Sequence, residues 1–138
     1  MTVQQQAIHM KRIVLGSLLG YIFIGLTSVM THQLLYAQMV PSEASPRTQY
    51  LAVITATDTA FAILGGWLCA AISRKRREAM LTLIVVGELS SVTLALLLWR
   101  VVPHFYNFVG WILYPPAVWL GARLGSLASP KTVSIRAE

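Results

Sequence analysis

Charged residues are scarce in this chain. Only 12% of its 138 residues are Asp, Glu, Lys or Arg, whereas a soluble domain has roughly 25%. Hydrophobic residues make up 56%, and the mean hydropathy is +0.64. This composition excludes an ordinary soluble globular domain and indicates an integral membrane protein.

Cysteine and the common catalytic patterns are also nearly absent. The single cysteine, Cys69, lies inside an apolar run and cannot form an intrachain disulfide, so we expect a small packing residue. No His, Cys or acidic cluster has metal-ligand spacing, and no phosphate loop or nucleophile elbow occurs. We therefore expect no metal, no cofactor and no recognisable enzyme site.

Two histidines offer the alternative of a haem or metal site. His32 and His104 both fall near the predicted outer surface, where a histidine pair could act as ligands. However, His104 sits in a turn, and His32 lies off the small-residue face of its helix. We interpret both as polar residues of the membrane interface.

Long apolar runs dominate the rest of the chain. The run Met80–Trp99 has the ~20 residues that a bilayer span needs, with Arg74–Arg77 before it and Arg100 after it. The complete pattern predicts an all-α, four-helix transmembrane bundle in a domain of residues 13–128, with spans at about 13–36, 50–73, 80–99 and 105–127. A signal peptide is the alternative for the first run, but its apolar part exceeds the roughly 7–15 residues of such a segment.

The basic residues predict the orientation of the spans. Nine of the 11 Lys and Arg residues fall on one side of the predicted bundle, and only Arg47 and Arg100 fall on the other. The positive-inside rule then places the tails 1–12 and 129–138 in the cytoplasm. Because the positive charge lies between apolar runs, we attribute the net charge of +6 to topology and expect no nucleic-acid partner.

Small residues recur on one face of each span and predict close helix packing. On the span 80–99, the opposite face carries Val85, Leu89, Val92 and Leu96, which suits lipid. Near the centre of the last span, Pro115 and Pro116 predict a kink, and Arg123 points away from the small-residue face. The predicted packing residues are Gly16, Gly20, Gly65, Gly66, Gly87, Ser91, Gly121 and Gly125.

Two carboxyl groups, Glu88 and Asp58, lie inside the predicted spans, where acidic residues are costly. At 1.5 Å per residue, Glu88 lies ~14 Å and Asp58 ~22 Å above the cytoplasmic helix ends, so the two are staggered. Both face small-residue surfaces. They act either as a proton or cation relay or as hydrogen-bond donors to Ser91, Thr55 or free carbonyls. No basic residue is expected beside either one, which favours the structural interpretation.

Several segments of the second to fourth spans together resemble small four-span bacterial inner-membrane proteins of uncharacterised function. These segments are Gly65–Ala71, the basic turn Arg74–Arg77, Pro115–Pro116 and Trp119–Gly125. The resemblance implies a bacterial inner-membrane location and brings no active site with it.

Three functions remain open from the sequence. The first is a non-catalytic subunit or accessory protein that packs against a larger membrane partner or against itself. The second is a small ion- or proton-coupled transporter or channel subunit that uses Glu88 and Asp58. The third, an enzyme with a membrane-embedded site, has the least support, because small size and small-residue faces favour helix association.

Overall fold

The computed structural model describes residues 3–39, 47–73, 76–97 and 104–128, and all of these except Ser73 are helical. The four helices are α1 (Val3–Met39), α2 (Arg47–Ile72), α3 (Arg76–Leu97) and α4 (His104–Ala128). The prediction of four helices is therefore confirmed. The predicted tail 129–138 lies outside the described residues.

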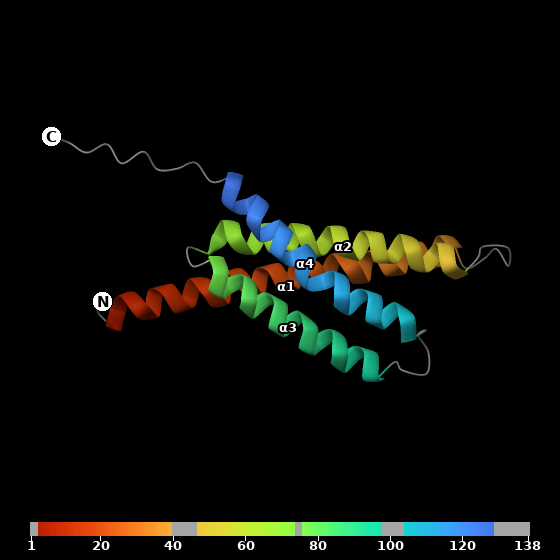
Figure 1. The fold of residues 1–138 in the computed structure, drawn as a ribbon, viewed down its shortest axis with the longest axis horizontal. Coiled ribbons are helices and arrows are strands. Elements are labelled where there is room, and N and C mark those ends of the chain that lie inside the picture. Colours follow the sequence, from red (N-terminus) through yellow and green to blue (C-terminus); the bar gives the residue numbers. More distant parts are fainter. Residues whose placement is uncertain (1–2, 40–46, 74–75, 98–103, 129–138) are drawn as a thin grey trace.

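Successive helices run in opposite directions (Figure 1). The first residues of α1 and α3 and the last residues of α2 and α4 lie at one end of the bundle. We call this the inner end, and we call the end with Met39, Arg47, Leu97 and His104 the outer end. As a result, α2 and α4 run parallel to each other, and α1 and α2 run antiparallel.

Three of the helices are long and apolar enough to cross a membrane: Met10–Leu35, Gln49–Ile72 and Arg77–Leu97. The fourth, α4, is not among them; its 25 residues include Asn107, Arg123 and the two prolines, which lower its hydropathy. It continues as one helix through Pro115 and Pro116, so any kink there does not break it. The fourth span remains a prediction.

The first helix is longer than its apolar run. It has 37 residues and begins at Val3, so most of the predicted tail 1–12 continues α1 as helix. Exposed Lys11 and Arg12 lie within this helical extension. Its cytoplasmic location stays a prediction.

The second helix lies at the centre of the fold. It packs extensively against α4 and α1, whereas α3 makes lighter contact with the other three helices. The most buried side chains, Cys69, Leu83 and Val118, lie toward the inner end and are fully buried. Burial of Cys69 confirms the packing role expected for it. The core is thus concentrated in the inner half of the bundle.

Glycines bring the helix backbones together, as predicted. A Cβ added to Gly20 would lie 2.9 Å from the carbonyl oxygen of Gly65 on α2, and one added to Gly121 would run into the backbone of Ile63. A Cβ at Gly66 would meet the backbone of Val118 in the same way. None of the described glycines has a positive φ, so space, and not backbone conformation, explains glycine at these positions. Gly16 and Gly125 likewise lie against backbone carbonyl oxygens of α2, those of Cys69 and Trp67, whereas Gly87 lies against the side chain of Tyr114.

The third helix partly departs from its predicted faces. Gly87 is buried against the Tyr114 ring, as expected for a packing residue. Ser91, in contrast, is exposed, and its Oγ accepts a hydrogen bond from Trp111 Nε1 at 3.1 Å. Ser91 thus contacts α4 through a hydrogen bond and not through close packing of the backbones, because α3 makes only light contacts with its neighbours. The predicted lipid face is exposed throughout, at Val85, Leu89, Val92 and Leu96.

Candidate functional site

One carboxylate joins three helices. Asp58 of α2 accepts a hydrogen bond from Ser28 Oγ of α1 at 2.6 Å, through Oδ1. Its other oxygen, Oδ2, lies 3.1 Å from His32 Nε2 of α1 and accepts a bond from the Tyr106 hydroxyl of α4 at 3.3 Å. An ionised carboxylate only accepts hydrogen bonds, and three donors on two oxygens suit that form. We call these four residues the Asp58 cluster.

The cluster corrects two predictions. His32 does not lie away from the packed face of α1, and Asp58 does not lack a basic partner, because the imidazole and the carboxylate are in hydrogen-bonding contact. Thr55, which was expected to accept from Asp58, instead donates to the Leu51 carbonyl of its own helix at 2.8 Å. Ser28 and Tyr106 were missed as partners altogether.

A four-residue spacing on α1 explains why His32 reaches α2. Gly16 and Gly20 approach Cys69 and Gly65 of α2, and Ile24 would touch a Cβ at Gly65. Ser28 and His32 continue the same row and reach Asp58. Rows at i, i+4 wind around a helix at about −26° to its axis. The contact face therefore drifts along α1, and extending the glycine spacing by fours would have predicted both partners.

The helices enclose the cluster only in part. The side chain of His32 is 40% exposed and that of Asp58 is 31% exposed. The cluster lies between the core and the outer end, on the side opposite the predicted basic turn. It is thus a polar site, not fully enclosed by protein, in an otherwise apolar pair of helices.

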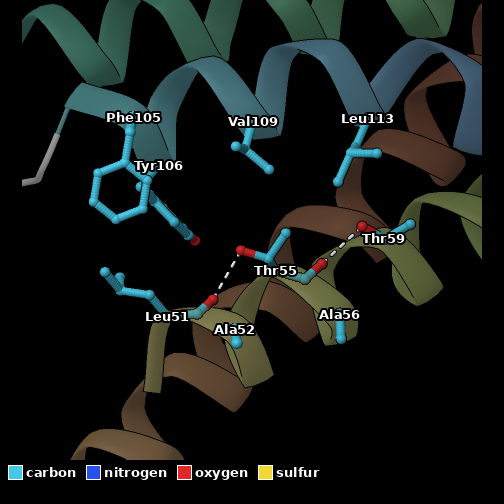
Figure 2. Close-up of a pocket in the computed structure, with 9 residues that line it drawn as sticks. All are labelled: Leu51, Ala52, Thr55, Ala56, Thr59, Phe105, Tyr106, Val109 and Leu113. Carbon is cyan, nitrogen blue, oxygen red and sulfur yellow. Dashed lines mark hydrogen bonds between the residues drawn. The ribbon is translucent and has the colours of Figure 1, made fainter. Parts of the chain in front are cut away.

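A groove of about 490 Å³ lies beside the cluster, between α2 and α4 (Figure 2). The hydroxyls of Thr55 and Thr59 are bonded to carbonyls one turn earlier in α2, so both threonines leave no free donor in the groove. Tyr106 lines the groove and also carries the hydroxyl that reaches Asp58. Its lining comprises Leu51, Ala52, Thr55, Ala56, Thr59, Phe105, Tyr106, Val109 and Leu113.

The second carboxyl group, Glu88, has a different environment. It is half-buried on α3, and its Oε1 is shielded from solvent without a hydrogen-bond partner among the described residues. The expected bond to Ser91 is not formed, since Ser91 bonds to Trp111. Glu88 belongs to the helix with the lightest packing, whereas Asp58 belongs to the central helix. The structure does not join the two carboxyl groups into one site.

The remaining candidates, Arg123 and His104, are both exposed. Arg123 is exposed and stacks over the Trp119 ring at 5.1 Å on the same helix, as expected for a residue facing away from the packed side. His104 is exposed at the start of α4. Within the described ranges, no three His, Cys, Asp or Glu residues are close enough to hold a metal ion.

Comparison with protein-family models, with curated proteins and with solved structures gives no match.

Proposed function

We propose that the chain is a four-span protein of the bacterial inner membrane with both termini in the cytoplasm. Alternating helix directions support this orientation (Figure 1). So do exposed basic residues near the inner end: Lys11, Arg12, Arg77 and Arg123. Cysteines introduced at Ala44 and Thr132 test it with a membrane-impermeant thiol reagent. Labelling from the periplasm at 44 but not at 132 is expected, and the reverse pattern would overturn the orientation.

Within this membrane, we propose a non-catalytic subunit that packs through α3 against a larger membrane partner. The observation that carries the proposal is the unpartnered carboxyl oxygen of Glu88. A polar group without a hydrogen bond is costly in an apolar environment, and intramembrane acids normally face protein or water. A donor side chain on a neighbouring transmembrane helix would satisfy it after rotation about its soft terminal torsion.

The rest of α3 supports the same surface. Among the described α3 residues that follow Glu88 in the sequence, only Ala95 is buried. Leu89, Leu94 and Leu96 are more than half exposed. The glycine faces, in contrast, are already used between α1, α2 and α4. We therefore expect a partner to pack against the exposed leucines of α3, and not against the glycine faces of the other helices.

Site-specific crosslinking tests this surface. Single cysteines at Leu89 and Leu96 on α3, each in a Cys69→Ala background, should crosslink one partner of constant mass in native membranes. Cysteines at Leu26 and Val29 on α1, which are also exposed, are the control and should not. Glu88→Leu should weaken the α3 crosslinks, and Glu88→Gln, which keeps a hydrogen-bonding group, should retain them. Equal crosslinking from α1 would refute the assignment, and a product of twice the chain mass would identify self-association instead.

A second candidate is a small ion- or proton-coupled transporter or channel subunit. The observation in its favour is the contact between Asp58 and His32, since paired ionisable residues inside a membrane domain commonly mark proton pathways. The separation of Glu88 from this pair favours the subunit instead. Glu88→Gln distinguishes them: a coupling site must lose proton-linked uptake or efflux in a stable protein. A structural Glu88 should leave assembly and stability nearly unchanged, since intramembrane hydrogen bonds average ~0.6 kcal/mol.

A further inference from the structure

The outer half of α1 is attached to the bundle in a different way from the inner half. At the inner end, Gly16 and Gly20 bring the α1 backbone against α2, and Ser17 is buried and donates to the Ala79 carbonyl of α3 at 2.9 Å. Beyond Gly20, no described residue of α1 is buried. An added Cβ at Gly25 would meet nothing within 4 Å.

Hydrogen bonds take over where the close packing ends. Ser28 and His32 both bond to Asp58, and Tyr106 brings α4 to the same carboxylate. These bonds join the outer half of α1 to α2 and, through the shared carboxylate, to α4. The strength of this attachment therefore depends on the charges of the cluster.

We propose that His32 and Asp58 form a proton-binding site that fastens the outer half of α1 to α2 and α4. Because an ionised carboxylate carries no hydrogen, His32 Nε2 must be the donor in the contact with Asp58. A hydrated proton from the outer aqueous phase then adds to the free Nδ1 and leaves water behind. The products are an imidazolium and a carboxylate in direct contact, and no other bond is broken.

Proton uptake strengthens the attachment. Before uptake the bond joins a neutral imidazole to a carboxylate, and after uptake it joins two groups of opposite charge. The Coulomb attraction between them is added to the bond, and it is larger in a low-dielectric environment than in water. Histidine ordinarily changes its charge between about pH 5 and pH 8. His32 lies three residues from the outer end of the apolar run Met10–Leu35, and its side chain is 40% exposed, so a proton from the outer aqueous phase can reach the ring. Acidification of the outer side should thus close α1 onto α2, and alkaline conditions should release it.

The titratable groups near Asp58 come from three helices. His32 of α1 and Tyr106 of α4 contact Asp58 directly, and exposed His104 lies two residues before Tyr106 at the start of α4. On α2 itself, Tyr50 interacts with Tyr106. The hydrogen bonds to Asp58 come from α1 and α4, and Glu88 on the described part of α3 is not among its partners. The site requires only that the outer end face water. It does not depend on the proposed packing of α3 against a partner, whereas the transporter candidate would use the same pair.

Spin-label distances in nanodiscs test the proposal. One label pair replaces exposed Leu34 on α1 and Val53 on α2, and a control pair replaces Met10 and Ala71 at the inner end, all in a Cys69→Ala background. From about pH 5.5 to about pH 8, across the usual range of histidine, the outer distance should lengthen and broaden. The inner distance should not change.

Two variants separate proton binding from mere contact. His32→Gln keeps a hydrogen-bond donor but cannot take up a proton, so it should abolish the pH dependence while the protein stays folded. Asp58→Asn keeps a hydrogen-bond acceptor but removes the negative charge, so it should also abolish the pH dependence of the outer distance. In ¹⁵N-histidine spectra, the signal that His32→Gln removes identifies the imidazole and reports whether it takes up the proton. An outer distance that is equal at both pH values, or a pH dependence that survives His32→Gln, would overturn the proposal.

Discussion

Replacing Gly121 by alanine should force α2 and α4 apart. The added methyl group would run into the carbonyl oxygen of Ile63, and it would lie 2.7 Å from the carbonyl carbon and 3.0 Å from Cα of the same residue. Ordinary van der Waals contact begins at 3.4 Å. The carbonyl carbon alone thus requires a separation of 3.4 − 2.7 = 0.7 Å, and backbone atoms cannot swing aside as a flexible side chain does.

The cost can be compared with a matched glycine on the same helix. Overpacking a close interface typically costs about 1–3 kcal/mol. A glycine-to-alanine change inside a helix also gains about 0.5–1 kcal/mol from backbone entropy. Gly110 lies on α4 as well, and a Cβ there would meet nothing within 4 Å. The difference between Gly121→Ala and Gly110→Ala cancels the common gain and should be about 1–3 kcal/mol in the free energy of unfolding.

The measurement is unfolding of the purified protein by SDS titration in mixed micelles, followed by circular dichroism or tryptophan fluorescence. Gly110→Ala should match or slightly exceed the wild type, and Gly121→Ala should unfold at a lower SDS fraction. If the two variants unfold together, the close approach of α2 and α4 at Ile63 is not present in the protein, and the central position of α2 must be abandoned.

Three further predictions use the same unfolding assay. Leu83→Ala removes a fully buried side chain and should lower the free energy of unfolding by ~2–5 kcal/mol. Leu89→Ala, at a position 65% exposed, should change it by no more than roughly 0.5 kcal/mol. Equal losses would contradict the position of the core. Ser17→Ala loses an interhelical bond to α3 and should cost ~0.6 kcal/mol, at most ~1.7, whereas Ser90→Ala loses only a bond within its own helix and should cost less. Cys69 is fully buried, so a maleimide should add mass to the protein only after SDS unfolding, and rapid labelling of the folded protein would show that this thiol is accessible.

The helices and most of their contact points could be predicted from the sequence because their signals are local. Apolar length marks a helix in a membrane, and a row of small residues marks where another backbone can approach. Gly20, Gly66 and Gly121 all lie where such rows predict. Ser91 lies on such a row but is exposed, because a small residue permits close packing without requiring it.

The partners of Asp58 could not be predicted by treating each helix face as a straight stripe. Gly16, Gly20, Thr27 and Thr31 share one such stripe, and His32 lies away from it. The real contact row advances by four residues and has turned far enough to include His32 at the outer end. Tyr106 was missed for another reason: aromatics near a helix start were attributed to the membrane interface, so the reach of its hydroxyl was not considered. The unpartnered oxygen of Glu88 depends on which helices lie nearby, and that is tertiary information.

The central position of α2 also sets an order for biogenesis. Its contact with α1 joins neighbours in sequence, so this hairpin can associate as soon as the second helix leaves the insertion machinery. Its glycine face at Gly66 must wait for Val118 and Gly121, which are synthesised only after the whole of α3. During that interval the most closely packed surface of the mature protein is covered by lipid alone. A chain that ends before His104 therefore lacks the helix that packs against Gly66 and Ile63 of α2.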